Sequence, residues 1–190
     1  VDGVSLSIGR GETYALVGES GSGKSTLGRA ILNLEPVAAG QILYQGAPIH
    51  ALERSAMQPY RKKIQVVFQN PYSSMNPRLT VQENLDFFAT IFNTSIKENY
   101  SLIKDIYQQI EPFKNRRAGK LSGGMKQKLA LSCALIHRPS VLFLDEPTTG
   151  VDAVSRKEFW HMLKQLQKEG ITILVSTPYM DEAALCDKVA

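Results

Sequence analysis

A glycine-rich stretch near the start of the chain holds the residues with the clearest chemistry. Residues 18–26, GESGSGKST, fit the pattern G-x-x-x-x-G-K-[ST], in which glycines let backbone N–H groups converge on phosphate oxygens. Lys24 can reach the β- and γ-phosphates of a nucleotide, and the hydroxyl of Ser25 can ligate Mg²⁺. The stretch predicts a nucleotide phosphate site made by Gly18, Ser20, Gly21, Ser22, Gly23, Lys24, Ser25 and Thr26.

Two carboxylates, Asp145 and Glu146, directly follow the apolar run 141–144. If the run is a buried strand, both acids lie at its C-terminal end, where α/β sheets bind ligands. There Asp145 would complete the Mg²⁺ shell, and Glu146 would polarise the attacking water as a general base. An apolar run that ends in Asp-Glu also fits a turn or a helix start, so it is the phosphate loop that favours the catalytic interpretation.

The stretch LSGGMKQK, residues 121–128, opens another helix. Ser122 is a good helix N-cap, and two glycines follow it. One interpretation is a cap and nothing more. The other is a second phosphate-binding helix start, with free N–H groups at the positive end of the helix dipole. The residues by themselves leave both interpretations open.

The stretch VSTPYMDE, residues 175–182, raises the question of whether a bound nucleotide would also be hydrolysed. A strand end beside such a nucleotide usually offers a polar group to the terminal phosphate, but Pro178 has neither a side-chain donor nor a backbone N–H. Ser176, Thr177 and Tyr179 carry hydroxyls that could replace it, although each also fits an ordinary strand end or helix cap. We expect hydrolysis that is slowed or differently coupled rather than absent.

The elements that must position these residues follow from hydrophobic periodicity and from glycine and proline. Alternation over residues 4–8 predicts a strand that forms a hairpin with, or lies beside, a strand at 13–17. The expected fold is α/β: a P-loop NTPase core with a mainly parallel sheet, an N-terminal antiparallel β piece and an inserted helical subdomain. Further strands are predicted at 41–44, 64–68, 141–144 and 171–175. Helices are predicted at 24–32, 123–136 and 154–168 and near Asp181.

The chain is expected to form a single domain over residues 1–190. We expect the core to comprise residues 1–69 and 137–190, and the helical subdomain to comprise residues 70–136. Because the chain begins and ends abruptly within structural elements, we expect both ends to continue in a longer domain.

Composition excludes several classes of protein. Hydrophobic residues make up 43% of the chain and charged residues 21%, as in an ordinary globular domain. No apolar run reaches the roughly 18 residues that span a bilayer, and the two cysteines lack metal or redox spacing. The net charge is +4, but the basic clusters at 61–63 and 114–120 lack interleaved stacking aromatics, so we expect no nucleic-acid partner.

Together these motifs resemble one family over nearly the whole chain: the nucleotide-binding domain of ATP-binding cassette (ABC) proteins. GESGSGKST resembles its Walker A loop, and VLFLDEP, residues 141–147, resembles its Walker B motif with Glu146 as the catalytic glutamate. LSGGMKQ matches the family's signature motif, which is far more specific than a phosphate loop. Gln69, at the end of VVFQ, resembles the Q-loop glutamine, and Asp152, in TTGVD, resembles the D-loop aspartate.

The resemblance implies ATP as the nucleotide, Mg²⁺ as the metal, and an ATPase that works as a head-to-tail dimer of two such domains. It implies that the catalytic residues are Glu146 and Gln69, and that the metal is held by Ser25, Gln69 and Asp145. Further nucleotide contacts are Asp152 of the D-loop and, across the dimer, the signature residues Ser122, Gly123 and Gly124. Hydrolysis would power transport through a transmembrane permease subunit or domain, with the chain as a peripheral protein on the cytoplasmic face of a membrane.

The chain departs from the family pattern in three places. The aromatic residue that stacks on adenine would fall before Val1, and Tyr14, the nearest aromatic residue, fits the core better. Pro178 stands where the family has its switch histidine. The first half resembles oligopeptide-importer ATPases and the second half resembles drug-exporter ATPases, so the direction of transport stays open. Two alternatives also stay open: an ATP-dependent dimerisation switch with weak hydrolysis, and a soluble ABC ATPase without a transport role.

Overall fold

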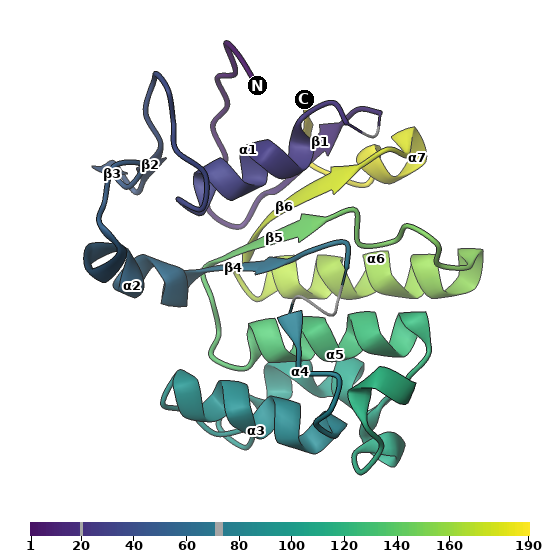
Figure 1. Ribbon diagram of the computed structural model, residues 1–190. Helices are drawn as coiled ribbons and strands as arrows, with labels where there is room; N and C mark the ends of the chain where they lie inside the picture. Colours follow the sequence, from purple (N-terminus) through teal and green to yellow (C-terminus); the bar gives the residue numbers. More distant parts are fainter. Residues whose placement is uncertain (20, 71–73) are drawn as a thin grey trace.

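The computed structural model describes residues 1–19, 21–70 and 74–190, and its centre is a five-stranded sheet in the order β4-β5-β6-β1-β7 (Figure 1). Every pairing in this sheet is parallel, which confirms the predicted core. The strands therefore end at one edge, where the predicted site residues follow them. The strands are β1 (Thr13–Val17), β4 (Ile64–Val67), β5 (Val141–Asp145), β6 (Thr172–Thr177) and β7 (Lys188–Val189).

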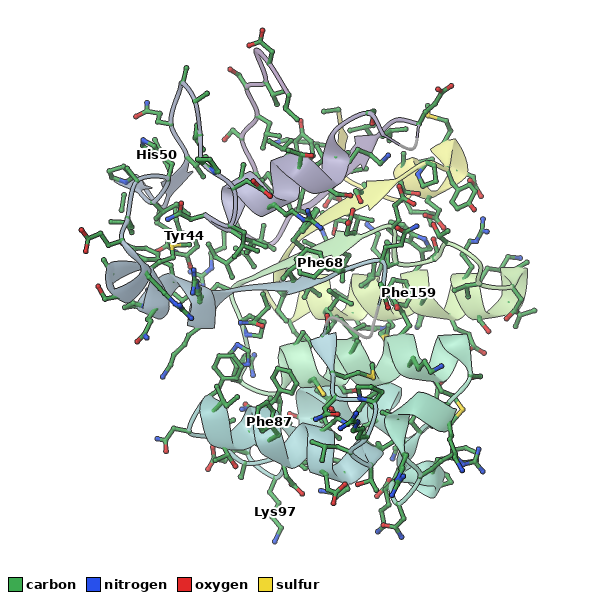
Figure 2. All side chains as sticks on the ribbon, in the orientation of Figure 1. Tyr44, His50, Phe68, Phe87, Lys97 and Phe159 are labelled. Carbon is green, nitrogen blue, oxygen red and sulfur yellow. The ribbon has the colours of Figure 1, made fainter. Side chains whose placement is uncertain are left out.

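Helices cover both faces of the sheet. Figure 1 shows α1 (Lys24–Ile31) over one face, and α6 (Ala153–Lys168) and α5 (Gly123–Leu135) on the other. Alternation along the strands decides which side chains each layer receives. The cluster on the α1 face comprises Tyr14, Leu16, Phe143 and Leu174, with Leu27 and Ile31 packed against it. Phe159 of α6, labelled in Figure 2, belongs to the cluster on the opposite face.

Close contact between α1 and β5 explains one glycine. A Cβ added at Gly28 would lie 2.1 Å from Cε1 of Phe143, so a larger residue would push the ring or the helix away. Glycine at this position lets α1 lie directly on the sheet, and this packing sets the height of the preceding loop above the strand ends.

An outer layer of helices covers α5. α3 (Val81–Ile91) and α4 (Tyr100–Tyr107) pack on α5, and one hydrophobic cluster runs from them through α5 and α6 to the sheet. Thr80 and Glu83 form a reciprocal capping box at the start of α3. None of the helices in the described residues is long and apolar enough to cross a bilayer. The remaining elements are α2 (Arg54–Lys63), α7 (Met180–Ala183), β2 (Leu43–Tyr44), β3 (Ala47–Pro48) and the 3-10 turns Glu111–Phe113 and Ala118–Lys120.

The N-terminal segment differs from the prediction. Residues 4–8 form no strand, although Leu6 and Ile8 pack against the cluster on the α1 face, as their alternation with polar residues indicates. Both edges of β1 are taken, because β6 pairs with one and β7 with the other. The predicted hairpin is therefore wrong, since no edge of β1 is left for it. The antiparallel piece of the fold is instead the short pair of β2 and β3.

Candidate functional site

The loop between β1 and α1 has the backbone shape that phosphate binding needs. Gly21 and Gly23 adopt φ values of 87° and 99°, in the left-handed region that favours glycine. A Cβ at Gly18 would lie 2.7 Å from the hydroxyl oxygen of Ser22, so this turn also excludes a side chain. No side chain caps α1 and its first turn has no acidic residue, so its N-terminal end suits an anion. Ser20, another predicted phosphate contact, lies outside the described residues.

Lys24 is buried at the mouth of this loop. Its Nζ donates hydrogen bonds to the carbonyl oxygens of Gly18 and Glu19, at 2.7 and 2.9 Å. The same nitrogen lies 3.4 Å from Oε1 of Glu146. The loop thus places a positive charge between itself and the end of β5.

Asp145 and Ser25 meet across the gap between β5 and α1. The Ser25 hydroxyl donates to Oδ1 of Asp145 at 2.8 Å, and the Ser176 hydroxyl donates to the same oxygen at 2.7 Å. Neighbouring ligands of an octahedral Mg²⁺ ion, with bonds of 2.0–2.1 Å, stand about 2.9 Å apart, so the Ser25–Asp145 pair fits two such ligands. The described residues hold no group of three His, Cys, Asp or Glu side chains suited to a metal. A Mg²⁺ ion here would take its other ligands from phosphate and water.

Glu146 is held in an unusual backbone conformation beside these groups. Its φ is 46°, which a residue other than glycine adopts only where its surroundings hold it, often at a functional site. Its N–H donates to both O and Oγ of Ser176, at 3.0 Å each. Its Oε2 accepts from Nε2 of Gln69 at 3.1 Å and from the Thr149 hydroxyl at 3.3 Å. Lys24, Gln69 and Glu146, which lie far apart in the sequence, are thereby brought into contact.

The signature residues and Asp152 lie apart from this group. Ser122 caps α5, accepting from the N–H of Met125 at 3.3 Å, and a Cβ added at Gly123 or Gly124 would meet nothing within 4 Å. α5 lies on the opposite side of the sheet from α1 (Figure 1). Within the described part of the chain, no hydrogen bond or ion pair joins residues 122–124 to the phosphate loop.

Asp152 caps α6 in the same way as Ser122 caps α5. Its Oδ1 accepts from the N–H groups of Val154 and Ser155, at 3.1 and 3.0 Å. These contacts, with the Ser155 backbone as the largest cause, lower the pKa of the Asp152 carboxyl. The residue is exposed, and its described contacts stay within its own helix start.

The hydroxyls around Pro178 have structural partners. Ser176 donates to Asp145, and Thr177 donates to Oε2 of Glu182 at 2.6 Å. The ring of Tyr179 lies 4.4 Å below the guanidinium carbon of Arg156. Of the three hydroxyls considered as substitutes for the switch histidine, two are therefore already engaged with carboxylates.

The motifs did not identify Glu182 as a residue of the site region, and they did not place Ser176 beside Asp145. The contact of Ser176 with Asp145 follows from the register of β5 and β6, in which the two residues are partners. Glu182 has no comparable signal, since its contacts depend on how α7 packs.

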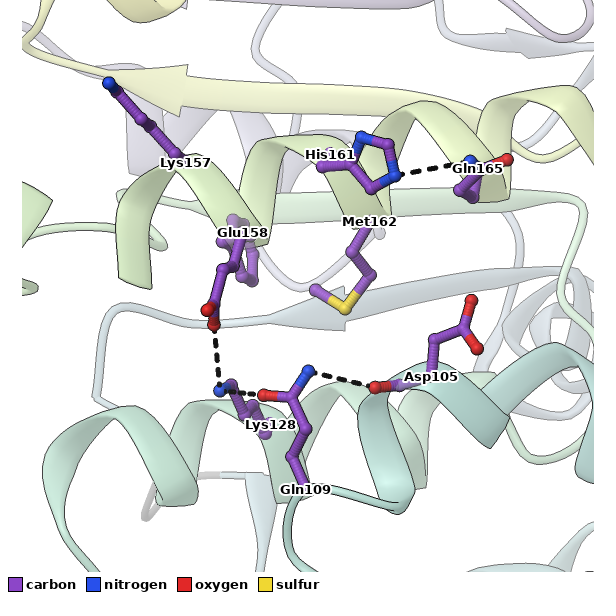
Figure 3. Close-up of a pocket in the computed structure, with 9 residues that line it drawn as sticks. Asp105, Gln109, Lys128, Lys157, Glu158, His161, Met162 and Gln165 are labelled. Atoms are coloured by element: carbon purple, nitrogen blue, oxygen red, sulfur yellow. Dashed lines mark hydrogen bonds and ion pairs between the residues drawn. The ribbon is translucent and has the colours of Figure 1, made fainter. Parts of the chain in front are cut away.

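The hollow shown in Figure 3 lies elsewhere, between α4, α5 and α6. Lys128 of α5 donates to Oε1 of Gln109 and lies 3.7 Å from Oε2 of Glu158. No residue of the phosphate loop or of the strand ends lines it. The candidate site is therefore defined by polar groups in contact at the sheet edge, not by this hollow.

A parallel sheet, a glycine loop that leads into α1, and a Ser–Asp pair at the neighbouring strand end define a P-loop nucleotide-binding domain. The family profile described as ABC transporter matches residues 1–149, and the chain belongs to this family. The family predicted from the motifs is confirmed, and with it the binding of adenine nucleotides that characterises ATP-binding cassettes.

Relatives and solved structures agree with this assignment. Nod factor export ATP-binding protein I of Burkholderia lata is 38% identical over 192 residues, which cover 100% of this chain and 61% of the relative. The structure of cbiO1 from Clostridium perfringens, part of the ABC transporter complex cbiONQ, has a TM-score of 0.85 at 32% identity, over 98% of this chain and 75% of its own. The ATP-binding cassette MJ0796, a dimer in a post-hydrolysis state bound to ADP and Pi, has a TM-score of 0.85 at 27% identity, over 97% of this chain and 82% of its own. The chain thus spans less than two thirds of the length of the curated relatives it matches.

Proposed function

We propose that the chain is the ATP-binding and ATP-hydrolysing unit of a transporter, acting as a head-to-tail pair of cassettes. The observation that carries this proposal is the contact of Lys24 and Gln69 with Glu146 at the strand ends, beside the Ser25–Asp145 pair. The dimeric cassette with ADP and Pi supports both hydrolysis and pairing. The name of the export ATP-binding relative supports export over import, and it does not favour a soluble ATPase without a transport role.

In this proposal the phosphates of ATP are bound by residues 18–26. Backbone N–H groups of the loop and the start of α1 donate to the phosphate oxygens, and Lys24 turns from the carbonyls of Gly18 and Glu19 to the β- and γ-phosphates. Ser25 and Asp145, together with Gln69, would hold Mg²⁺, which would offset the negative charge of the phosphates.

Glu146 is the general base and Gln69 positions it. Glu146 accepts a proton from the attacking water, a role that contributes about 10²- to 10⁴-fold to a rate. The hydrogen bond between the two side chains supports this pairing of roles. Because Pro178 adds no donor, Glu146 works without the help of a switch histidine, and turnover is slower for that reason.

Ser122, Gly123, Gly124 and Asp152 act on the nucleotide of the partner cassette. The open surroundings of the two glycines and the exposed start of α5 support this role, because the N–H groups there remain accessible to a second chain. A complete site then needs two cassettes, each supplying one half.

The partners are the second cassette and a transmembrane permease subunit or domain, with the chain as a peripheral protein on the cytoplasmic face of a membrane. The description of cbiO1 as part of a transporter complex supports such an assembly. Residues 70–136 form the helical subdomain, inserted into a core of residues 1–69 and 137–190. The packing of α3 and α4 on α5 supports this division. No nucleic acid takes part.

The test is steady-state ATP hydrolysis by the full-length protein, measured as phosphate release over a range of protein concentrations. We expect Mg²⁺-dependent turnover whose specific activity rises with concentration as dimers form. Glu158→Gln, on the exposed side of α6, is a control that should leave the activity unchanged. Absence of hydrolysis, or a specific activity independent of concentration, would contradict the proposal.

A further inference from the structure

A buried carboxylate lies behind the strand ends that carry the site. Glu182, on α7, is 1% exposed. Its Oε1 accepts a hydrogen bond from the Thr148 hydroxyl at 2.5 Å, and its Oε2 accepts one from the Thr177 hydroxyl at 2.6 Å. The Nε of Arg156, on α6, lies 3.5 Å from Oε1 and balances the charge. One side chain thus holds groups from three other segments of the chain.

The two threonines bring this carboxylate next to the proposed reaction machinery. Thr148 is the second residue after Glu146, in the loop that leaves β5, and Thr177 is the last residue of β6, directly before Pro178. Thr148 and Thr177 are 1% and 0% exposed, so their hydroxyls cannot turn to bulk water for a partner. Glu182 therefore connects the loop of the general base to the loop where the switch histidine is absent.

Glu146 needs such support because of its backbone conformation. A φ of 46° persists in a residue other than glycine only when neighbouring contacts over-determine it. Ser176 holds its N–H on the side of β6, and the contact of Thr148 with Glu182 holds the other side of the loop. Loss of the Thr148 contact would free the loop after Glu146 while β5 and the phosphate loop stay in place.

We propose that Glu182 is a positioning residue for ATP hydrolysis, which fixes Glu146 through Thr148 and the Pro178 loop through Thr177. The inference rests on the proposed hydrolytic function. Pro178 offers no donor for a hydrogen bond between the two loops. The buried carboxylate of Glu182 connects them instead, through its hydrogen bonds with Thr148 and Thr177. Being 1% exposed, Glu182 acts through the two threonines and not on the nucleotide.

The first test compares the turnover of Thr148→Val and Thr177→Val with wild type in the full-length protein. Valine keeps the shape of threonine and removes the hydroxyl, so each variant removes one of the two hydrogen bonds to Glu182. Thr13→Val is the matched control, because Thr13 is equally buried on β1 and its hydroxyl has no hydrogen-bond partner in the described structure. We expect kcat to fall about 10- to 100-fold in Thr148→Val, as for a catalytic group displaced by about 1 Å, with unchanged ATP affinity. The control should keep the wild-type kcat.

The second test is amide hydrogen exchange in residues 146–151 of the same variants. We expect faster exchange there in both threonine variants and not in Thr13→Val. The result for Thr177→Val is the decisive one, since its hydroxyl contacts Glu182 and the Tyr179 N–H and, in the described structure, makes no direct hydrogen bond to residues 146–151. Glu182→Gln keeps an oxygen acceptor for one threonine, so it should recover part of the kcat lost in Glu182→Ala.

Two results would overturn the inference while leaving ATP hydrolysis standing. One is a wild-type kcat and unchanged exchange at 146–151 in both threonine variants. The other is a loss of kcat matched by an equal loss of ATP affinity, because a displaced base slows turnover without releasing the nucleotide. A wild-type protein that does not hydrolyse ATP would instead overturn the proposed function, and the exchange comparison would still decide whether Glu182 links the two loops.

Discussion

Two regions of the molecule carry motifs that we propose bind phosphate, and the chain assembles them to different degrees. At the strand ends, Lys24 contacts Glu146, and Ser25 contacts Asp145, so the chain's own fold assembles the group. At the start of α5, Ser122 caps its own helix, and the glycines after it have open space around them. One half of the proposed site is therefore assembled within the chain, whereas the other half presents an open surface to a second chain.

The largest expected effect is at the strand ends, with Lys24→Ala. The substitution leaves the carbonyls of Gly18 and Glu19 and the Glu146 carboxylate facing the phosphates without a compensating cation. We expect ATP binding to weaken by about 2–5 kcal/mol, which abolishes it at micromolar nucleotide. Titration calorimetry measures the affinity for ATP, with Lys157→Ala, at an exposed position of α6, as the control. Unchanged affinity in Lys24→Ala would contradict the assignment of the phosphate loop.

Glu146→Gln should separate binding from chemistry within the same region. Glutamine keeps the size of the side chain but cannot accept the proton from water. We expect kcat to fall by about 10²-fold or more while ATP binding persists. Phosphate release and nucleotide binding, measured on the same preparation, check this. Turnover that survives the substitution would show that Glu146 is not the base.

Ser122→Asp tests whether the start of α5 serves a different chain. Aspartate caps a helix as well as serine does, so α5 should keep its stability, whereas Ser122→Ala should lose about 1 kcal/mol. A carboxylate there would face the partner's phosphates, and we expect a loss of at least about tenfold in the concentration-dependent hydrolysis. ATP affinity of the dilute protein should not change. Weaker binding by the dilute protein would mean that α5 contacts the nucleotide of its own chain.

Pro178→His tests the position that differs from the family. The imidazole would add a donor and acceptor at the end of β6. We expect kcat to rise about tenfold, less than the 10²- to 10⁴-fold of a general base, because Glu146 keeps that role. ATP affinity should stay the same. A kcat unchanged by the substitution would mean that the link through Glu182 and the base Glu146 already provide what the strand end needs.

The smallest expected effect concerns the other end of α5, where His137 stacks on Phe92 with ring centroids 3.6 Å apart. Burial lowers the pKa of His137 from 6.5 to about 4. Between these two values the unfolded chain binds a proton that the folded chain does not. The contribution of neutral His137 to the free energy of unfolding is therefore fully present above pH 6.5 and is lost as the pH falls to about 4. We expect a loss of about 1–2 kcal/mol, less than full linkage because the ring is partly exposed.

Urea unfolding at pH 7.5 and 4.5 measures that loss. His137→Phe keeps the stacked ring and should remove this part of the pH dependence. An equal slope in wild type and variant would show that another group is responsible. ATP binding near neutral pH should be the same in both, because this end of α5 lies away from the strand ends.

Much of the fold and of the site follows from the order of residues. The parallel strands were predicted because continuous apolar runs alternate with helical spacing, and Asp145 and Glu146 were placed at a strand end by position alone. The hairpin at residues 4–8 could not be judged from its alternation, because that pattern reports burial of Leu6 and Ile8 and not a backbone partner. Whether β1 had a free edge depended on β7, the last strand of the chain.

The sequence by itself determined the available chemistry: which groups could bind phosphate, which carboxylates follow a strand, and where a proline stands in place of a hydrogen-bond donor. The tertiary structure alone decided which of these groups meet. Ser176 reaches Asp145 through strand register, and Glu182 reaches Thr148 and Thr177 through the packing of α7. The contacts of Asp145 with Ser176 and of Thr148 with Glu182 join residues 31 and 34 positions apart. They leave no period in a sequence, because they depend on how separately formed elements pack around one core.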